Sequence, residues 1–250
     1  MTKPVNLHHL ALIKIFQDHQ NLTPNNDWLK KYLGTNKTLY NLKTADKVKL
    51  VKSYVKFHIT TFSDYLDLLL SLAQGSSFEE LSTMGILLGH FPKFRQQLTT
   101  SVIDRLFDHV KGWAETDITC SFSAEDLLNN WHEWQKLLDK FVKDANIHKR
   151  RASLVLLTNP VRQSSDPRLS KIAFAYVNRL KTEHDILITK AVSWILRSLI
   201  KFHQDKVASY LGVNLDTLPK IVLREVSTKL ATGRKYVNKK LPVKKSHGQK

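Results

Sequence analysis

Apolar residues recur along this chain at intervals of three and four, while alternating runs of β-branched residues are nearly absent. This pattern predicts amphipathic helices rather than strands. Glycine occurs only eight times in 250 residues, which also favours an all-helical protein. We predict helices of about ten to eighteen residues separated by short breaks. Their starts are expected near His8, Asp27, Thr44, Thr61, Ser77, Phe94, Ser123, Ile147, Pro167, Asp185, Gln204 and Asn214.

Two of these starts carry the sequence of an N-terminal capping box. Ser77 is followed three residues later by Glu80, and Ser123 by Asp126 in place of the usual Glu. In such a box the serine oxygen and the acidic side chain each accept a hydrogen bond from a backbone N–H at the helix end. Both segments are therefore predicted to begin helices at these serines.

The spacing of the helix starts indicates how the helices are arranged. Successive starts lie about 17 to 20 residues apart, so one helical pair would occupy about 35 to 45 residues. That period is typical of HEAT-like repeats stacked into a curved solenoid with a basic concave groove. A compact helical bundle remains the alternative. No change of composition marks a second folded domain, so we expect one domain over residues 1–231 and a basic, disordered tail over residues 232–250.

The charge of the chain indicates a polyanionic partner. Lys and Arg number 39 against 22 Asp and Glu, which gives a formal net charge of +17. Seven of these cations lie in residues 232–250, which contain no acidic residue, yet residues 1–231 keep a net charge of +10. DNA, RNA or an anionic membrane surface would each match this excess.

Other residue types narrow the class of protein further. Cys120 is the single cysteine, which excludes an intrachain disulfide and fits a reducing compartment. No Cys or His cluster has zinc-site spacing, and no run approaches the eighteen or so apolar residues of a membrane span. We therefore expect a cytoplasmic monomer without metal, cofactor or membrane attachment.

Two short segments place aromatic and charged residues on one helix face. Lys190, Trp194 and Arg197 are offset by four and three residues, and Trp113 precedes Asp117 by four, so each set projects from one side of a helix. Cations beside a broad aromatic ring suit a phosphate with a sugar or base next to it. Taken alone, the same residues also fit a buried Trp, solvated cations and a surface carboxylate.

Four stretches in the same order resemble the AlkD-type DNA alkylation repair proteins, which are glycosylases built from HEAT-like repeats. The first runs from Tyr32 to Thr44, and the second, Trp113-Ala-Glu-Thr-Asp117, matches the W-x-x-x-D signature. The third begins at Lys149-Arg-Arg-Ala-Ser, and the fourth, Lys190-Ala-Val-Ser-Trp-Ile-Leu-Arg197, is followed by Leu223-Arg-Glu225. The family's usual residues are replaced by Ala45, Ala114 and Ser193, which indicates a divergent member.

The resemblance implies a role for each matching residue. Asp117 falls on the catalytic carboxylate, Arg151 on an essential arginine, and Trp113 and Trp194 on aromatics that hold the sugar of the damaged nucleotide. DNA-contacting residues are expected to line the cleft or reach the phosphates, and we assign to this set Tyr32, Lys43, Thr44, Lys47, Arg150, Lys190 and Arg197.

The expected function follows from these roles. The resemblance implies hydrolysis of the N-glycosidic bond of cationic N3- or N7-alkylated purines in double-stranded DNA, without enclosure of the base. A non-catalytic HEAT-like protein that binds damaged or branched DNA is the main alternative. A protein-interaction scaffold is a third, for which a charge of +17 would be unusual.

Overall fold

The computed structural model describes residues 6–21 and 27–236, and within these ranges the chain forms helices and no strand. The predicted all-α class is thus confirmed. The helices are α1 (Leu7–Asp18), α2 (Asp27–Leu33), α3 (Thr44–His58), α4 (Phe62–Ala73), α5 (Phe78–His90), α6 (Pro92–Arg95), α7 (Thr100–Phe107), α8 (Gly112–Thr119), α9 (Ala124–Asn129), α10 (Trp131–Phe141), α11 (Ile147–Thr158), α12 (Pro160–Gln163), α13 (Pro167–Leu180), α14 (Ile186–Gly212) and α15 (Lys220–Thr232).

Local capping signals set many of the helix starts. The side chain of Ser77 accepts a hydrogen bond from the N–H of Glu80, whose carboxylate accepts one from Ser77, and Ser123 and Asp126 form the same reciprocal pair. Both predicted capping boxes are therefore confirmed. Asp185 caps α14 in a simpler way, by accepting a hydrogen bond from the N–H two residues later.

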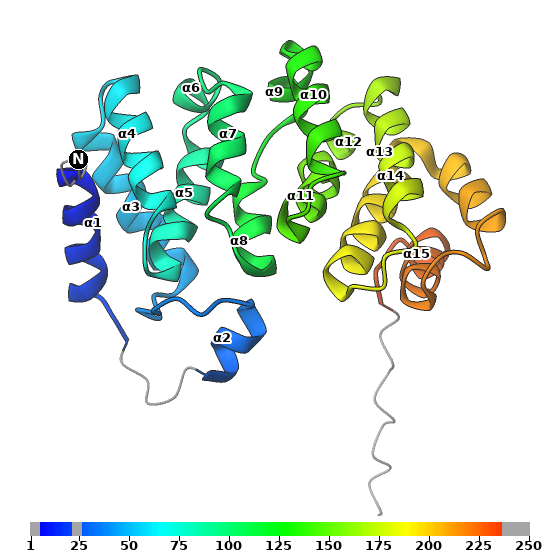
Figure 1. Ribbon diagram of the computed structural model, residues 1–250, viewed down its shortest axis with the longest axis horizontal. Coiled ribbons are helices and arrows are strands. Elements are labelled where there is room, and N and C mark those ends of the chain that lie inside the picture. Colours follow the sequence, from blue (N-terminus) through cyan, green and yellow to red (C-terminus); the bar gives the residue numbers. More distant parts are fainter. Residues whose placement is uncertain (1–5, 22–26, 237–250) are drawn as a thin grey trace, which may run out of the picture.

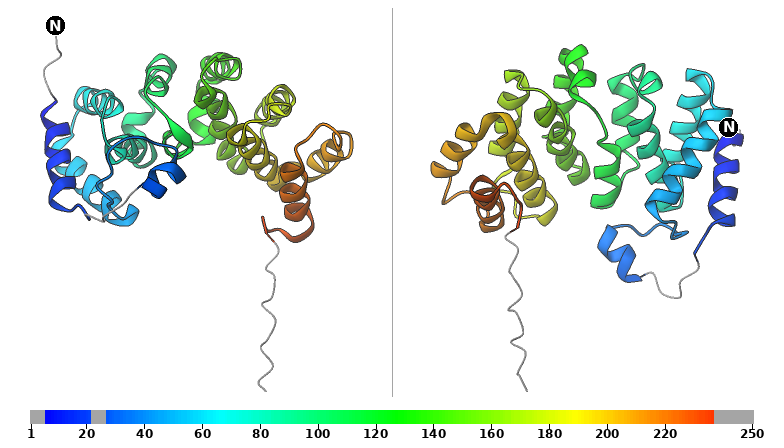
Figure 2. Two further views of the ribbon diagram at one scale, coloured as in Figure 1. Left: turned by 60° about the horizontal axis from the view of Figure 1, so that its bottom comes forward. Right: turned by 180° about the vertical axis from the view of Figure 1, so that it is seen from behind.

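The helices follow one another along the longest dimension of the molecule (Figure 1). Helices α5, α8, α11 and α14 pack against one another in that order, with α15 against α14. A second set lies beside them: α4 packs on α5, α10 on α7 and α11, and α13 on α11 and α14. The left view of Figure 2 shows that the succession is curved, with α2 on the inner side of the arc.

One apolar core runs the length of this arc, from Leu12 in α1 to Val226 in α15. Close packing between neighbouring helices depends on small residues at particular positions. At Gly85 of α5, an added Cβ would lie 2.8 Å from the carbonyl oxygen of Ile118 in α8. Glycine therefore allows α5 to approach the helix that carries Trp113 and Asp117. No helix among the described residues is both long and apolar enough to cross a membrane.

The structure differs from the predicted helix starts towards the C-terminus. The break expected near Gln204 is a kink, where His203 leaves helical geometry with φ −137° and ψ 39° inside α14. The start expected at Asn214 is wrong, because α15 begins at Lys220. The amide of Asn214 instead donates to the carbonyl of Tyr210, so this residue helps to end α14. The region near Phe94 holds one short turn, α6, before α7 begins at Thr100.

Candidate functional site

Three helices bring the predicted catalytic residues together around one open cavity of about 500 Å³. Trp113 and Asp117 come from α8, Arg151 from α11 and Trp194 from α14, and α2 adds Tyr32, a predicted DNA contact. The cavity is completed by Ile186, Leu187, Lys190, Arg197 and Lys235. Residues that are more than 160 positions apart in the sequence thus meet at one site.

Asp117 and Arg151 form a two-point ion pair at this cavity. The Arg151 Nε donates to Asp117 Oδ1 at 2.9 Å and Nη2 donates to Oδ2 at 2.8 Å. A third guanidinium hydrogen bond, from Nη1, reaches the carbonyl of Leu187 at the start of α14. The Arg151 side chain is only 5% exposed, against 16% for Asp117. The arginine therefore fixes the carboxylate and leaves little guanidinium surface for a phosphate.

Burial changes the acidity of this carboxylate. Desolvation raises the pKa of Asp117 above its ordinary value, and the hydrogen bond and charge of Arg151 oppose that rise. The folded protein therefore holds a proton on Asp117 more tightly than the unfolded chain does. Stability is lost as pH rises through this raised pKa, so the ionised carboxylate is maintained at neutral pH at some cost in stability.

Trp113 is held in place by Tyr32. The indole Nε1–H donates to the Tyr32 carbonyl at 2.5 Å, and the two rings meet edge to face with centroids 5.4 Å apart. Tyr32 is still 61% exposed, so this pair forms an aromatic wall at the cavity rather than part of the core.

Two glycines let α2 and α8 approach closely enough to form this wall. Gly34 and Gly112 both have positive φ, +72° and +74°. A Cβ on Gly112 would lie 2.3 Å from the carbonyl oxygen of Gly34 and 2.8 Å from that of Leu33. These are backbone atoms, which cannot move aside as a flexible side chain can.

We expect Gly112→Ala to lower the free energy of unfolding by at least about 2 kcal/mol, because it combines an unfavourable φ with a backbone clash. Gly233→Ala is the matched control, since Gly233 has φ +70° but, among the described residues other than its chain neighbours, no atom within 4 Å of an added Cβ. Its cost should be only about 1 kcal/mol. Urea denaturation of both variants measures the difference. Equal losses would show that the contact between Gly34 and Gly112 contributes nothing.

Glu115 also ties the segment after α2 to α8, a role that the sequence analysis did not predict. Glu115 is 1% exposed, and its carboxylate accepts hydrogen bonds from the Thr35 hydroxyl at 2.8 Å and from the Lys111 N–H at 2.8 Å. Burial raises the pKa of Glu115, against the effect of these donors. The signal that could have found it is its position within the W-x-x-x-D segment, on the opposite face from Asp117.

The basic face of α14 is organised by a buried acid. The Glu225 carboxylate, 1% exposed, lies 3.2 Å from Lys190 Nζ, 3.8 Å from Arg197 Nε and 3.5 Å from Lys235 Nζ. Ser193 donates a hydrogen bond to it at 2.6 Å. Burial alone would raise the pKa of Glu225, but these donors and cations hold it below its ordinary value. Three cations are thereby gathered at one edge of the cavity.

This arrangement explains one departure from the family pattern and bears on the predicted tail. Ser193 replaces the expected glycine, and its fully buried hydroxyl is used by Glu225. Lys235 belongs to the predicted tail of residues 232–250, yet it lines the cavity. Thr232 ends α15, and residues 237–250 lie outside the described residues.

Four of the predicted DNA contacts do not line the cavity. Lys43 and Thr44 are exposed at the start of α3. Lys47 is only 4% exposed, and its ammonium donates to Ser82 at 2.5 Å, so it is not placed to reach a phosphate. Burial also lowers the pKa of Lys47. Arg150 instead makes a two-point ion pair with Glu183, with contacts of 3.0 to 3.2 Å.

Comparison with known families gives a match over most of the chain. The family model for DNA alkylation repair enzymes matches residues 14–230, which is most of the chain. The protein therefore belongs to the DNA alkylation repair enzyme family, as the sequence resemblance indicated. Membership identifies it as a DNA repair enzyme with DNA as its substrate. No curated protein gives a significant match.

Proposed function

We propose that the protein is a DNA glycosylase that excises N3- and N7-alkylated purines from double-stranded DNA. The observation that supports this most is the Asp117 carboxylate, fixed by Arg151 in an open cavity that Trp113 and Trp194 also line. We further propose that the curved array of helices is a HEAT-like solenoid whose inner side receives the duplex.

The reaction needs a fixed negative charge more than it needs an acid. An alkylated purine already carries a positive charge, so its N-glycosidic bond is weakened. As the C1′–N9 bond breaks, its electron pair leaves with the base and positive charge develops on the deoxyribose. Water then adds to C1′ and releases a proton. Asp117 would stabilise the cationic sugar and orient the water.

The aromatic residues would act on the same sugar. The faces of tryptophan rings attract positive charge, so Trp113 and Trp194 would both pack the deoxyribose and favour its cationic state. Among the described residues that line the cavity there is no histidine or glutamate to protonate a departing base. The site is thus suited to bases that leave without help from an acid.

The rates of base release from three substrates test this proposal. We expect a single-turnover rate for a bulky N7 adduct within about tenfold of that for N7-methylguanine, because an open cavity does not reject added volume. Hypoxanthine, which is uncharged, should be released at least about 100-fold more slowly in the absence of a general acid. Release of free base from short duplexes, compared with spontaneous depurination, measures all three rates.

Two outcomes would contradict the proposed glycosylase function. A lack of base release from N7-methylguanine, with DNA binding retained, would support a binding protein without catalytic activity. Fast release of hypoxanthine with rejection of the bulky adduct would indicate a pocket that encloses a flipped base.

A further inference from the structure

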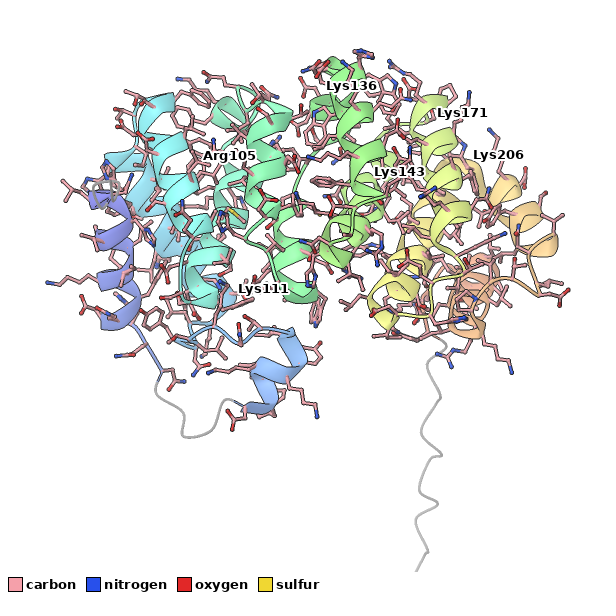
Figure 3. The ribbon with its side chains drawn as sticks, viewed as in Figure 1. Arg105, Lys111, Lys136, Lys143, Lys171 and Lys206 are labelled. Atoms are coloured by element: carbon pink, nitrogen blue, oxygen red, sulfur yellow. The ribbon has the colours of Figure 1, made fainter. Side chains whose placement is uncertain are left out.

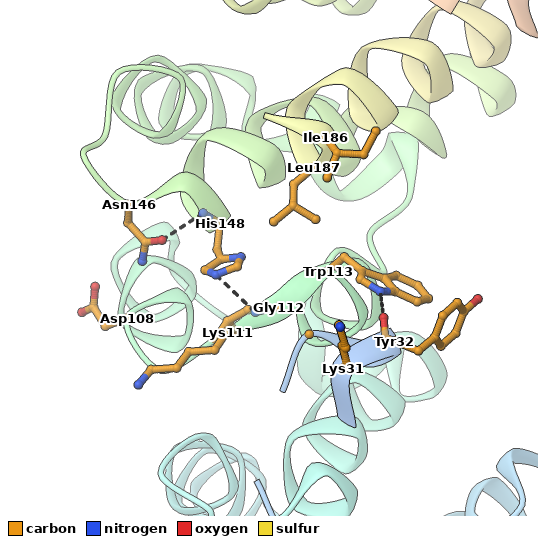
Figure 4. Close-up of a pocket in the computed structure, with 12 residues that line it drawn as sticks. Lys31, Tyr32, Asp108, Lys111, Gly112, Trp113, Asn146, His148, Ile186 and Leu187 are labelled. Atoms are coloured by element: carbon orange, nitrogen blue, oxygen red, sulfur yellow. Dashed lines mark hydrogen bonds between the residues drawn. The ribbon is translucent and has the colours of Figure 1, made fainter. Parts of the chain in front are cut away.

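A second cavity, of about 610 Å³, adjoins the first (Figure 4). The two share four lining residues, Tyr32, Trp113, Ile186 and Leu187. The aromatic wall and the start of α14 therefore separate two halves of one larger groove. The proposed glycosylase chemistry uses only the half that contains Asp117.

The second cavity has cations of its own. Lys31 in α2 and Lys111, directly before α8, both line it and are both exposed. Within the described part of the chain, neither ammonium lies within 4.0 Å of a carboxylate. Asp108 also lines the cavity, but its charge is offset by Lys149 Nζ at 2.6 Å. Lys31 and Lys111 thus supply positive charge that no described carboxylate holds in an ion pair.

The remaining polar groups of this cavity are fixed by hydrogen bonds. His148 Nε2 accepts from the Gly112 N–H at 3.2 Å, and the Asn146 Oδ1 accepts from the His148 N–H at 2.9 Å (Figure 4). Burial, aided by the charge of Arg151, lowers the pKa of His148, so the ring is neutral at neutral pH. The cavity therefore relies on its two lysines for charge, while the rest of its lining is preorganised.

We propose that this cavity binds the backbone phosphate next to the nucleotide whose sugar lies against Trp113, and that Lys111 and Lys31 bind that phosphate. This inference rests on the proposed function. Each sugar in a strand has a phosphate on either side of it. With the sugar at the aromatic wall, one phosphate would face Lys190, Arg197 and Lys235, and the other would face Lys31 and Lys111. Contacts of this kind fix the register of a strand rather than read its bases.

Lys111→Met tests the assignment through binding rather than catalysis. The probe is a duplex with a tetrahydrofuran abasic analogue, in which one flanking phosphate at a time is replaced by an uncharged methylphosphonate. We expect Lys111→Met to weaken binding of the unmodified duplex roughly tenfold, as for one charge-assisted hydrogen bond. The salt slope should fall by about one. For the wild type, one methylphosphonate position should cause the same loss, and Lys111→Met should not respond to that position.

Lys206→Met is the matched control. Lys206 is exposed like Lys111 but lies on a distant part of the molecule (Figure 3). The DNA affinity of Lys206→Met should stay within about twofold of that of the wild type, and this variant should keep the wild-type response to every methylphosphonate. Lys31→Met, which leaves the segment before α8 intact, provides a second variant if Lys111→Met folds poorly.

The outcomes separate this inference from the proposed function. If Lys111→Met and Lys31→Met both behave like Lys206→Met, or lose affinity equally with every methylphosphonate, the phosphate assignment is wrong even where base release is normal. If one methylphosphonate position weakens binding by the wild type but not by Lys111→Met, and no base is released, the phosphate site stands and the glycosylase proposal fails.

Discussion

Asp117→Asn should lower the single-turnover release of N7-methylguanine at least about 100-fold while DNA affinity stays within about threefold of the wild type. The amide keeps an oxygen that can accept from Arg151 Nε, so the side chain should remain in place. What is lost is the negative charge that stabilises the cationic sugar. A carboxylate repels phosphate, so its removal should not weaken binding. Base release and fluorescence anisotropy with the same duplex measure the two effects.

Asp166→Asn is the control for this substitution. Asp166 is also a partly exposed aspartate bound at two points by an arginine, Arg168, but it lines neither of the two cavities. Its base release should be within about threefold of the wild type. If Asp117→Asn released base as fast as the wild type, Asp117 would have no part in the chemistry and the proposed mechanism would fail.

Arg151→Lys should lower base release roughly 100-fold at neutral pH and change its pH dependence. Lysine keeps the charge but cannot make the two-point pair with Asp117 or reach Leu187 with the same geometry. Burial already raises the pKa of Asp117, and Arg151 opposes that rise. With a weaker partner the pKa should rise further. Since the ionised carboxylate is the active form, activity should be lost at a higher pH as the solution is acidified.

Single-turnover rates measured between about pH 5 and pH 8 would show this shift of the acidic limb. Arg150→Lys is a closely matched control, because Arg150 also binds a carboxylate at two points, that of Glu183. It should keep the wild-type profile. A loss of activity in Arg151→Lys without any change in the acidic limb would mean that Arg151 acts on something other than Asp117.

Short-range signals account for what the sequence predicted well. Capping at Ser77, Ser123 and Asp185 depends on residues two or three positions away, so the pattern itself contains the information. The spacing of Trp113 and Asp117 likewise predicted that both project from one side of a helix, and both line the same cavity. The helix start predicted at Asn214 is wrong, because the Asn214 side chain instead donates to the Tyr210 carbonyl near the end of α14.

Features set by distant parts of the chain could not be predicted in this way. From the sequence, Lys47 is expected to be a surface cation. Its ammonium is instead buried and donates to the hydroxyl of Ser82, a residue 35 positions away. Glu225 gathers cations from α14 and from Lys235 only because α15 packs on α14. The need for glycine at position 112 is explained by the backbone of Gly34, which leaves no room for a Cβ there. Each of these depends on packing between helices rather than on spacing along one helix.

The contacts of Arg151 have a mechanical consequence. This one guanidinium, carried by α11, bonds to a side chain of α8 and to the backbone at the start of α14, so it spans three successive helices of the arc. Any flexing of the arc that spreads α8 from α14 must stretch these bonds. The position of the carboxylate is therefore coupled to the curvature of the whole protein, and a duplex that alters that curvature would also adjust the alignment of Asp117.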